Sequence, residues 1–440
     1  MNKYDIVIAG AGPAGLMAAR AGAEAGLKVA LLDRKKDIPR ISRSCGGMIN
    51  VKEEPFGEVV LFDEEKRELD FTESGFTIEY NGPFQSVYGF QIYSPGGRRL
   101  EFGDFSRLRE DPAANRLGLA MSKEVLLRGI LEEVEKLGVA VFPNVNVCSV
   151  QQEASGAVVA CEDGSTFAGT FVLAADGINS RIVRALGLNK GRPFWGTSRT
   201  ASVAVKGTDC PDPEGFLVMV TPKGIGSMIP VGEKDCYHIY ASTYARDVKP
   251  MEFLHYFIHE DPTFSRWYKN STLLDERTAC IVNVMKPLEV PFKDNVLIIG
   301  DACWRREISN VGALCSGWQA GRAVARALGA GSAGKEALEE YITWYQEHFY
   351  GPHGEKIPGG RDIFHYLEAE EIDYLAELPK GELPQSLDIF RVIRCIGRTY
   401  SELLTRIYEE RPDIMDKLMK ARENMDDDMA EQVKWGFKNV

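Results

Sequence analysis

Residues 4–19 read Tyr-Asp-Ile-Val-Ile-Ala-Gly-Ala-Gly-Pro-Ala-Gly-Leu-Met-Ala-Ala, and this stretch decides the fold. The apolar run at 6–8 is typical of a strand buried on both faces, and the Ala-rich segment that follows predicts a helix. Between them, Gly10, Gly12 and Gly15 form the pattern G-x-G-x-x-G. In such a turn the first glycine permits the tight bend, the second lets the backbone approach a pyrophosphate, and the third lets helix and strand pack closely.

The context of the turn strengthens this interpretation. The helix that starts at about Ala14 offers free N–H groups and the positive end of its dipole to phosphates. A second buried strand over 29–32 ends at Asp33, where an acid can accept hydrogen bonds from ribose hydroxyls. The sequence therefore predicts a dinucleotide site. A glycine-rich turn used only for packing is the alternative, and it explains neither the acid nor the order of strand, turn and helix.

Composition limits the class of protein. A chain of 440 residues with 44% hydrophobic and 26% charged residues predicts a globular protein of two or three domains. The net charge of −12 argues against nucleic acid as a partner. The nine cysteines contain no C-x-x-C pair and the histidines show no ligand spacing, so we expect no metal site. An odd number of scattered cysteines and the lack of a long apolar run predict a cytoplasmic protein without a transmembrane segment, with a peripheral membrane contact left open.

The loop after Asp33 is basic and ends in small residues. It runs from Arg34 through Arg43 to Cys45, Gly46 and Gly47. Such a loop can wrap an anionic cofactor, and paired glycines let the backbone approach a flat ligand. A solvated basic loop is the alternative.

Two further strands end in residues that suit a ligand. A buried strand over 171–175 delivers Asp176 and Gly177, and another over 296–299 delivers Gly300 and Asp301. Ligands of open α/β sheets bind at the carboxyl ends of strands. A glycine-punctuated helix begins near residues 312–313, and its small residues indicate close approach either to a ligand or to a packed neighbour.

The rest of the chain changes character twice. Residues 55–105 and 195–285 alternate as half-buried strands, with a helix at about 251–258, which indicates a mostly antiparallel sheet. From 329 onward the chain is helical and charged, with helices expected over 335–349, 361–378, 386–410 and 412–435.

Taken together, the glycine pattern, the acid after the second strand, Asp-Gly-x-x-Ser at 176–180 and Gly-Asp-Ala at 300–302 resemble the para-hydroxybenzoate hydroxylase superfamily of FAD-dependent oxidoreductases. The resemblance covers residues 1 to about 330. It implies an α/β fold in which a Rossmann-like FAD-binding domain (1–70, 106–195 and 286–330) is interleaved with an antiparallel β-sheet substrate domain (71–105 and 196–285). A C-terminal helical region (331–440) follows.

The resemblance also implies the residues that contact FAD. The glycine turn with Ala14 would hold the pyrophosphate and Asp33 the adenosine ribose. The remaining expected contacts come from the basic loop, the two later strand ends and the start of the glycine-punctuated helix: Arg34, Arg43, Cys45, Gly46, Gly47, Asp176, Gly177, Gly300, Asp301, Gly312 and Ala313.

Within the superfamily, the Cys45-Gly46-Gly47 loop is most similar to the geranylgeranyl reductase branch, which reduces isoprenoid double bonds. Geranylgeranyl reductases carry Tyr-x-Trp-x-Phe-Pro in the substrate sheet, whereas residues 225–230 here read Ile-Gly-Ser-Met-Ile-Pro. Flavin halogenases carry Trp-x-Trp-x-Ile-Pro at the same place. Both aromatic residues of these motifs are missing here, which argues against halogenation and weakens the case for a long polyprenyl substrate. Candidate substrate contacts are Met228 in this segment, and Arg305 and Arg306, which can hold an acid by bidentate contacts.

The predicted function is a flavin-dependent reduction or dehydrogenation of a carbon–carbon double bond in a small or lipid-like substrate. Cys45 is the side chain expected nearest to the reacting centre, as a proton donor or a flavin contact, with a small core residue as the alternative. The electron donor is expected to be NAD(P)H or a low-potential protein such as ferredoxin, and a homo-oligomer is possible. An FAD-dependent monooxygenase, a flavoprotein electron carrier to a quinone and a non-enzymatic flavoprotein remain as alternatives.

Overall fold

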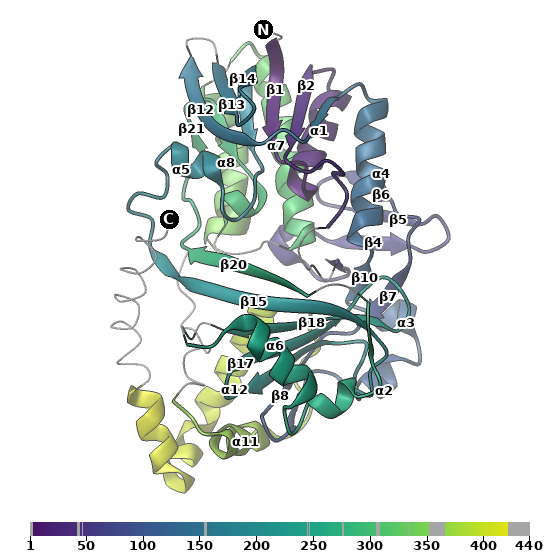
Figure 1. Cartoon of the computed structure of the whole chain (residues 1–440), viewed down its shortest axis with the longest axis vertical. Helices are drawn as coiled ribbons and strands as arrows, with labels where there is room; N and C mark the ends of the chain where they lie inside the picture. The colour runs from purple at the N-terminus through teal and green to yellow at the C-terminus, as the bar shows by residue number, and fades with distance from the viewer. Residues whose placement is uncertain are drawn as a thin grey trace.

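The computed structural model describes residues 3–41, 45, 47–153, 156–243, 245, 247–274, 277–304, 309–332, 334–351 and 366–420. Figure 1 shows two sheet regions that follow each other along the long axis of the molecule. The chain passes between them several times, because segments from both halves of the sequence contribute to each region. The mixed α/β architecture predicted from the sequence is confirmed.

The first region is an eight-stranded sheet in the order β11-β2-β1-β14-β13-β12, with β22 beside β14 and β21 beside β22. Its centre is parallel, and β12, β13 and β21 add antiparallel pairs. Almost every side chain of the central strands is buried, as expected for strands covered on both faces. The strands are β1 (Lys3–Ala9), β2 (Val29–Asp33), β11 (Ala140–Pro143), β12 (Val147–Glu153), β13 (Gly156–Cys161), β14 (Thr166–Ala174), β21 (Phe292–Lys293) and β22 (Val296–Ile298).

The helices of this region pack closely because they are rich in small residues. A Cβ atom added at Gly317 would lie 2.0 Å from the Ala14 carbonyl oxygen, and one at Gly321 would lie 2.7 Å from that of Ala18. These two glycines therefore serve contact between helices, not approach to a ligand. The helical segments are α1 (Pro13–Glu24), α4 (Lys123–Lys136), α5 (Arg181–Ala185), η3 (Gly300–Ala302), α7 (Asn310–Gly329), η4 (Lys335–Leu338), α8 (Glu339–Tyr345) and η5 (Gln346–Tyr350).

Two three-stranded sheets lie between the large sheets. One has the order β3-β10-β7 and the other β4-β5-β6. The expected division of the chain places residues 76–79 in the substrate domain, but this strand, β6, pairs with β5, and Phe76 packs in the core of the first region. The strands are β3 (Met48–Asn50), β4 (Val60–Asp63), β5 (Glu68–Phe71), β6 (Phe76–Glu79), β7 (Phe84–Val87) and β10 (Gly118–Met121), with the short helix η1 at Pro55–Gly57.

The second large sheet has the order β19-β15-β18-β17-β16-β8-β9, and β20 also pairs with β15. All pairs are antiparallel except β16 with β8. The mostly antiparallel sheet and the helix predicted at 251–258 are confirmed, the helix as α6. The elements are β8 (Phe90–Tyr93), β9 (Arg99–Glu101), α2 (Phe105–Leu108), α3 (Pro112–Asn115), β15 (Phe194–Lys206), β16 (Phe216–Thr221), β17 (Gly224–Pro230), β18 (Cys236–Thr243), α6 (Pro250–His259), η2 (Ser265–Tyr268), β19 (Thr272–Leu273) and β20 (Thr278–Met285).

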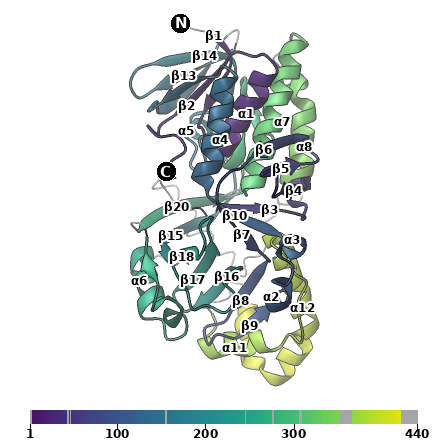
Figure 2. The ribbon, with the colours of Figure 1, turned by 90° about the vertical axis from the view of Figure 1, so that its right-hand side faces the viewer.

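The two faces of this sheet carry different partners, as Figure 2 shows with α6 and α12 on opposite sides. α6 covers one face, where Met228 and Ile239 are fully buried. α12 (Ile389–Glu410) crosses the other face over β8 and β16, where Phe90 and Phe216 pack with Val392.

The C-terminal helices differ from the expectation at their starts. α11 (Ala369–Glu377) begins later than predicted because Glu368 and Glu371 form a capping box that sets its N-terminus. α12 begins at Ile389 after Asp388, whose side chain accepts a hydrogen bond from the Phe390 N–H. Residues 412–420 are helical, and the remainder of the predicted last helix lies outside the described residues.

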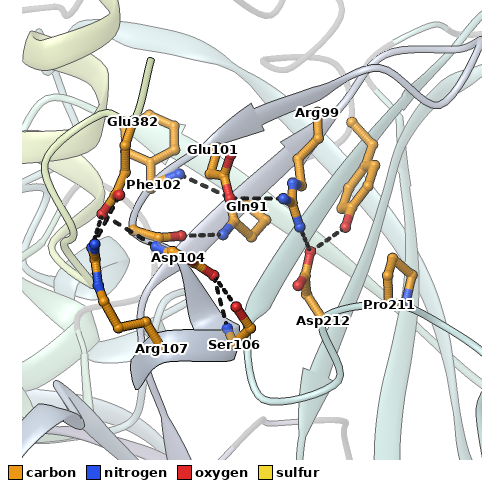
Figure 3. Close-up of polar contacts among 12 residues, drawn as sticks. Gln91, Arg99, Glu101, Phe102, Asp104, Ser106, Arg107, Pro211, Asp212 and Glu382 are labelled. Atoms are coloured by element: carbon orange, nitrogen blue, oxygen red, sulfur yellow. Dashed lines mark hydrogen bonds and ion pairs between the residues drawn. The ribbon is translucent and has the colours of Figure 1, made fainter. Parts of the chain in front are cut away.

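A buried polar network joins β8, β9 and the loop before β16 (Figure 3). Asp212, 4% exposed, accepts hydrogen bonds from the Tyr93 hydroxyl at 2.5 Å and from Arg99 at 2.7 Å. We expect Asp212→Ala to lower the free energy of unfolding by about 3 kcal/mol, because it leaves a partly buried guanidinium and a buried hydroxyl without their shared acceptor. Denaturant unfolding measures this loss. Glu101→Ala, which removes the more exposed partner of Arg99, serves as the control and should cost less than about 1 kcal/mol.

Glu53 follows strand β3 and connects it to the segment just before α12. It is 8% exposed, and its carboxylate accepts hydrogen bonds from the Ser386 hydroxyl and the Leu387 N–H, both at 2.7 Å. Burial raises the pKa of Glu53 above its ordinary value of 4.5, and the two hydrogen bonds oppose that rise only in part. The folded protein therefore binds a proton at this carboxyl more readily than the unfolded chain does.

The raised pKa of Glu53 makes the free energy of unfolding decrease as the pH rises. Because the folded-state pKa is raised, the contribution of the protonated form to stability is complete below pH 4.5 and declines as the pH rises through the folded-state pKa. We expect the stability of the wild type, relative to Glu53→Gln, to fall as the pH rises from 4.5 toward neutrality. Paired urea titrations across that range measure it, and a difference that is constant with pH would contradict the assignment.

Candidate cofactor and active site

The glycine turn leaves a cradle at the start of α1. Gly10 has φ +104°, and a Cβ there would lie 2.3 Å from the Ala175 carbonyl oxygen, while one at Gly15 would lie 1.8 Å from the Gly10 carbonyl oxygen. These two glycines are required by packing. Gly12 is different, because a Cβ at this position would meet no atom within 4 Å. Gly12 is also the N-cap of α1, and no side chain caps this helix, so the N–H groups of its first turn have no side-chain acceptor and suit a phosphate.

Asp33 lies beside this cradle and is 7% exposed. Its carboxylate accepts hydrogen bonds from the N–H groups of Ala11 and Lys35, both at 2.8 Å. The acid thus holds the glycine turn against the end of β2. Each carboxylate oxygen keeps a second lone pair, so the arrangement leaves acceptors for a ribose hydroxyl.

The Asp176–Gly177 segment is adjacent to the cradle, since a Cβ at Gly10 would lie 3.1 Å from the Asp176 Cα. The Asp176 carboxylate caps α5, accepting hydrogen bonds from the Ser180 hydroxyl at 2.6 Å and the Arg181 N–H at 2.8 Å. Burial raises the pKa of Asp176, and these hydrogen bonds oppose the rise. Gly177, with φ +86°, has open space on its Cβ side.

The Gly300–Asp301 turn approaches the same point from β22. Gly300 has φ +61°, and a Cβ there would lie 2.9 Å from the Ala14 Cβ. The Gly300 N–H donates to the Ser316 hydroxyl of α7 at 3.2 Å. Asp301 follows in η3 at this junction. The ends of β1, β14 and β22 therefore meet at the start of α1, as the sequence predicted for a single ligand site.

The first turn of α7 faces the basic loop. Ser309 caps the helix through the Gly312 N–H at 3.1 Å, and Asn310 donates to the Met48 carbonyl oxygen at 2.9 Å. Ala313 follows and is 8% exposed. The start of α7 is thus joined to β3, directly after the loop that carries Cys45.

Cys45 is half-buried, and the Lys123 ammonium group lies 3.5 Å from its sulfur. Gly47 fits tightly beside β10, because a Cβ there would lie 2.0 Å from the Met121 carbonyl oxygen. Arg34 is exposed. The predicted contacts Arg43, Gly46, Arg305 and Arg306 lie outside the described residues.

Sequence reasoning missed Arg192. Its guanidinium donates to the carbonyl oxygens of Lys286, Cys303 and Trp304, the last at 2.5 Å. Burial lowers the pKa of this guanidinium. Arg192 therefore braces the segment directly after Asp301. A single arginine in a polar loop shows no pattern, so nothing in the sequence indicates this role.

The predicted substrate contact Met228 requires a correction. Met228 is 0% exposed, in the core between the sheet and α6, and its cross-strand neighbours Leu217 and Ile239 are equally buried. Successive residues of a strand point to opposite faces, so Ser227, which is half-buried, lies on the other face. Met228 therefore belongs to the core between the sheet and α6 and cannot contact a substrate.

No helix in the described part of the chain is both long and apolar enough to cross a membrane. Among the same residues, no group of three or more His, Cys, Asp or Glu side chains is arranged to hold a metal ion.

Comparison with known proteins gives consistent results. Residues 3–343 match the family model described as FAD binding domain. Digeranylgeranylglycerophospholipid reductase 1 of Methanococcoides burtonii is 23% identical over 416 residues, covering 92% of this chain and 94% of that protein. Among solved structures, a geranylgeranyl bacteriochlorophyll reductase-like protein from Thermoplasma acidophilum superposes with a TM-score of 0.70 at 17% identity, over 93% of this chain and 99% of the other.

A variant of the halogenase PltM in complex with FAD also shares the fold, with a TM-score of 0.60 at 14% identity, over 98% of this chain and 97% of the other. The cradle at Gly12, the adjoining Asp33 and the family match agree on the cofactor, which is FAD. The chain belongs to the FAD binding domain family and is an FAD-dependent oxidoreductase.

Proposed function

We propose that this FAD-dependent oxidoreductase reduces a carbon–carbon double bond of a lipid-like substrate. The observation that carries the proposal is the open cradle at Gly12, where the ends of β1, β14 and β22 meet. The printed names of the curated relatives support the reaction class, since they are digeranylgeranylglycerophospholipid reductases. Bound FAD supplies the redox chemistry of such a reaction.

The protein's own contribution is to bind and orient. We propose that the N–H groups at the start of α1 hold the pyrophosphate, that Asp33 accepts from the ribose, and that Gly177 and Asp301 border the cofactor. Arg192 would keep the Asp301 segment in place through its three carbonyl contacts.

Cys45 is the proposed side chain beside the reacting centre. The ammonium group of Lys123 lies 3.5 Å from its sulfur. The pair can hold a proton or contact the cofactor. Lys123 is the first residue of α4, and Ser122 is its N-cap. In the family that the chain resembles, an arginine usually stands at the position of Ser122.

The cellular location, the electron donor and the oligomeric state are also proposals. All nine cysteines are free, which suits the reducing cytoplasm. NAD(P)H or a ferredoxin-like protein would supply electrons, and a homo-oligomer remains a proposal.

The test uses the FAD-loaded full chain under nitrogen. The protein is reduced with dithionite, freed of excess reductant and mixed with digeranylgeranylglycerophospholipid. We expect the flavin absorbance to return without oxygen and mass spectrometry to find lipid that has gained two hydrogen atoms per reduced bond. If the absorbance returns only with oxygen and the product carries an added oxygen atom, the protein is a monooxygenase and the proposal fails.

A further inference from the structure

α12 lies at the outside of the second region, and one side of this helix faces away from the sheet (Figure 2). Its inner side packs through Val392 and Ile407, each 1% exposed. On the outer side, exposed residues recur every three or four positions and so form one line along the helix. We name this line the charged stripe, and it consists of Arg391, Arg394, Arg398, Glu402, Thr405 and Glu409.

The charged stripe is divided by sign. Its first half carries only arginines, and its second half carries Glu402 and Glu409. The dipole of a helix favours the opposite order, with acids in the first turn and bases in the last. The order of charges therefore does not stabilise α12 itself.

The charges of the stripe are also unpaired within the described part of the chain. Arg406 and Glu410 of the same helix, which lie off the stripe, form an ion pair of 2.7 Å. By contrast, no arginine or glutamate of the stripe forms an ion pair with another described residue. Arg398 and Glu402 have the same i,i+4 spacing as that pair and yet do not join. The stripe thus presents a positive and a negative block to whatever lies outside the chain.

A second copy of the same helix complements this order of charges. In an antiparallel pair of helices around a two-fold axis, the first half of each stripe meets the second half of the other. With the axis midway along the stripe, Arg391 faces the partner's Glu409, and Arg398 faces the partner's Glu402. We infer that two copies of this chain associate through α12, with each of these ion pairs formed twice.

The residues around the ion pairs suit the same partner. Arg394 faces the partner's Thr405, whose short side chain lets the two helices approach. Tyr408 is 65% exposed and lies beside the stripe, where its ring can receive an arginine of the second copy. The net charge of −12 makes most approaches of two copies repulsive, and the two blocks of the stripe provide one that is attractive. Dimerisation through α12 goes beyond the proposed function and does not rest on it.

Sedimentation velocity of the FAD-loaded full chain measures the association. The acidic variant combines Arg391→Glu with Arg398→Glu, and the basic variant combines Glu402→Arg with Glu409→Arg. In each variant like charges face each other across the two-fold axis, so we expect the dissociation constant of the dimer to rise by about 100-fold or more. An equimolar mixture of the two variants should form a heterodimer, because their stripes are complementary again.

The heterodimer separates loss of association from loss of folding, because a misfolded variant would not regain association on mixing. The control combines Lys136→Glu with Lys190→Glu, which changes the net charge as much as the acidic variant does, at exposed positions outside α12. This control should remain a dimer. The dissociation constant of the wild type should also rise with ionic strength, because salt screens exposed ion pairs.

Four results would each overturn the inference: a monomeric wild type, a wild-type dimer that ionic strength does not weaken, an unaltered dimer in either variant, or a mixture that stays monomeric. All four leave the proposed function in place, because the reduction of the lipid is measured separately. Conversely, a dimer that does not reduce the lipid would contradict the proposed function alone.

Discussion

Gly12→Val should retain the fold and lose FAD. A side chain at Gly12 points into open space, and the backbone there is extended (φ −76°, ψ −175°), which valine adopts without strain. The branched side chain would occupy the space where the pyrophosphate meets the first turn of α1. We expect FAD affinity to fall roughly 100-fold, which corresponds to about 2.7 kcal/mol.

The measurement is FAD binding to the apoprotein by flavin fluorescence quenching, with circular dichroism and the melting temperature of the apoprotein to report the fold. Gly15→Ala is the matched contrast, because its Cβ would lie 1.8 Å from the Gly10 carbonyl oxygen and the turn cannot accept it. Gly15→Ala should therefore fail in both assays. If the Gly12→Val protein folds and binds FAD with unchanged affinity, FAD does not bind in this cradle.

Gly317→Ala should be strongly destabilising although it adds only one methyl group. The new Cβ would lie 2.0 Å from the Ala14 carbonyl oxygen and 2.7 Å from its carbonyl carbon, both of them backbone atoms that cannot rotate away. α1 and α7 would have to separate. We expect the free energy of unfolding to fall by about 3 kcal/mol, at the upper end of the cost of overpacking.

Gly329→Ala provides the control in the same helix. A Cβ at Gly329 would meet no atom within 4 Å, and alanine has the higher helix propensity, so this variant should be neutral or more stable by up to about 1 kcal/mol. Denaturant unfolding of both proteins gives the comparison. Equal effects from the two substitutions would show that helix propensity, and not contact between the helices, governs α7.

The local elements around the cofactor were accessible to sequence reasoning because each has a short-range cause. The buried strand over residues 3–9 has an apolar run, α1 has its glycine turn, and Asp33 ends a second apolar run. The start of α5 also has a local cause, because the Ser180 side chain caps the helix by accepting a hydrogen bond from the Val183 N–H.

The errors share a physical origin in contacts between distant segments. Met228 and Ser227 are neighbours in the chain, and only the position of α6 decides which of them is covered. The partners of Arg192 are carbonyl groups about a hundred residues away, which leave no trace in the local pattern. Likewise, β6 pairs with β5 in a hairpin. No local feature of the sequence distinguished this pairing from a pairing of the same residues with the second large sheet.

The sequence by itself determined that this protein has a dinucleotide site, since a glycine turn between a buried strand and a helix, with an acid after the next strand, suits a pyrophosphate and a ribose. Only the tertiary structure decided which glycine is free for the ligand and which are occupied by packing, because Gly12 and Gly15 differ solely in what lies opposite them. It also decided which side of the second sheet α6 covers. Alternation along a strand separates two faces, but only the packed helix decides which of them becomes the apolar core.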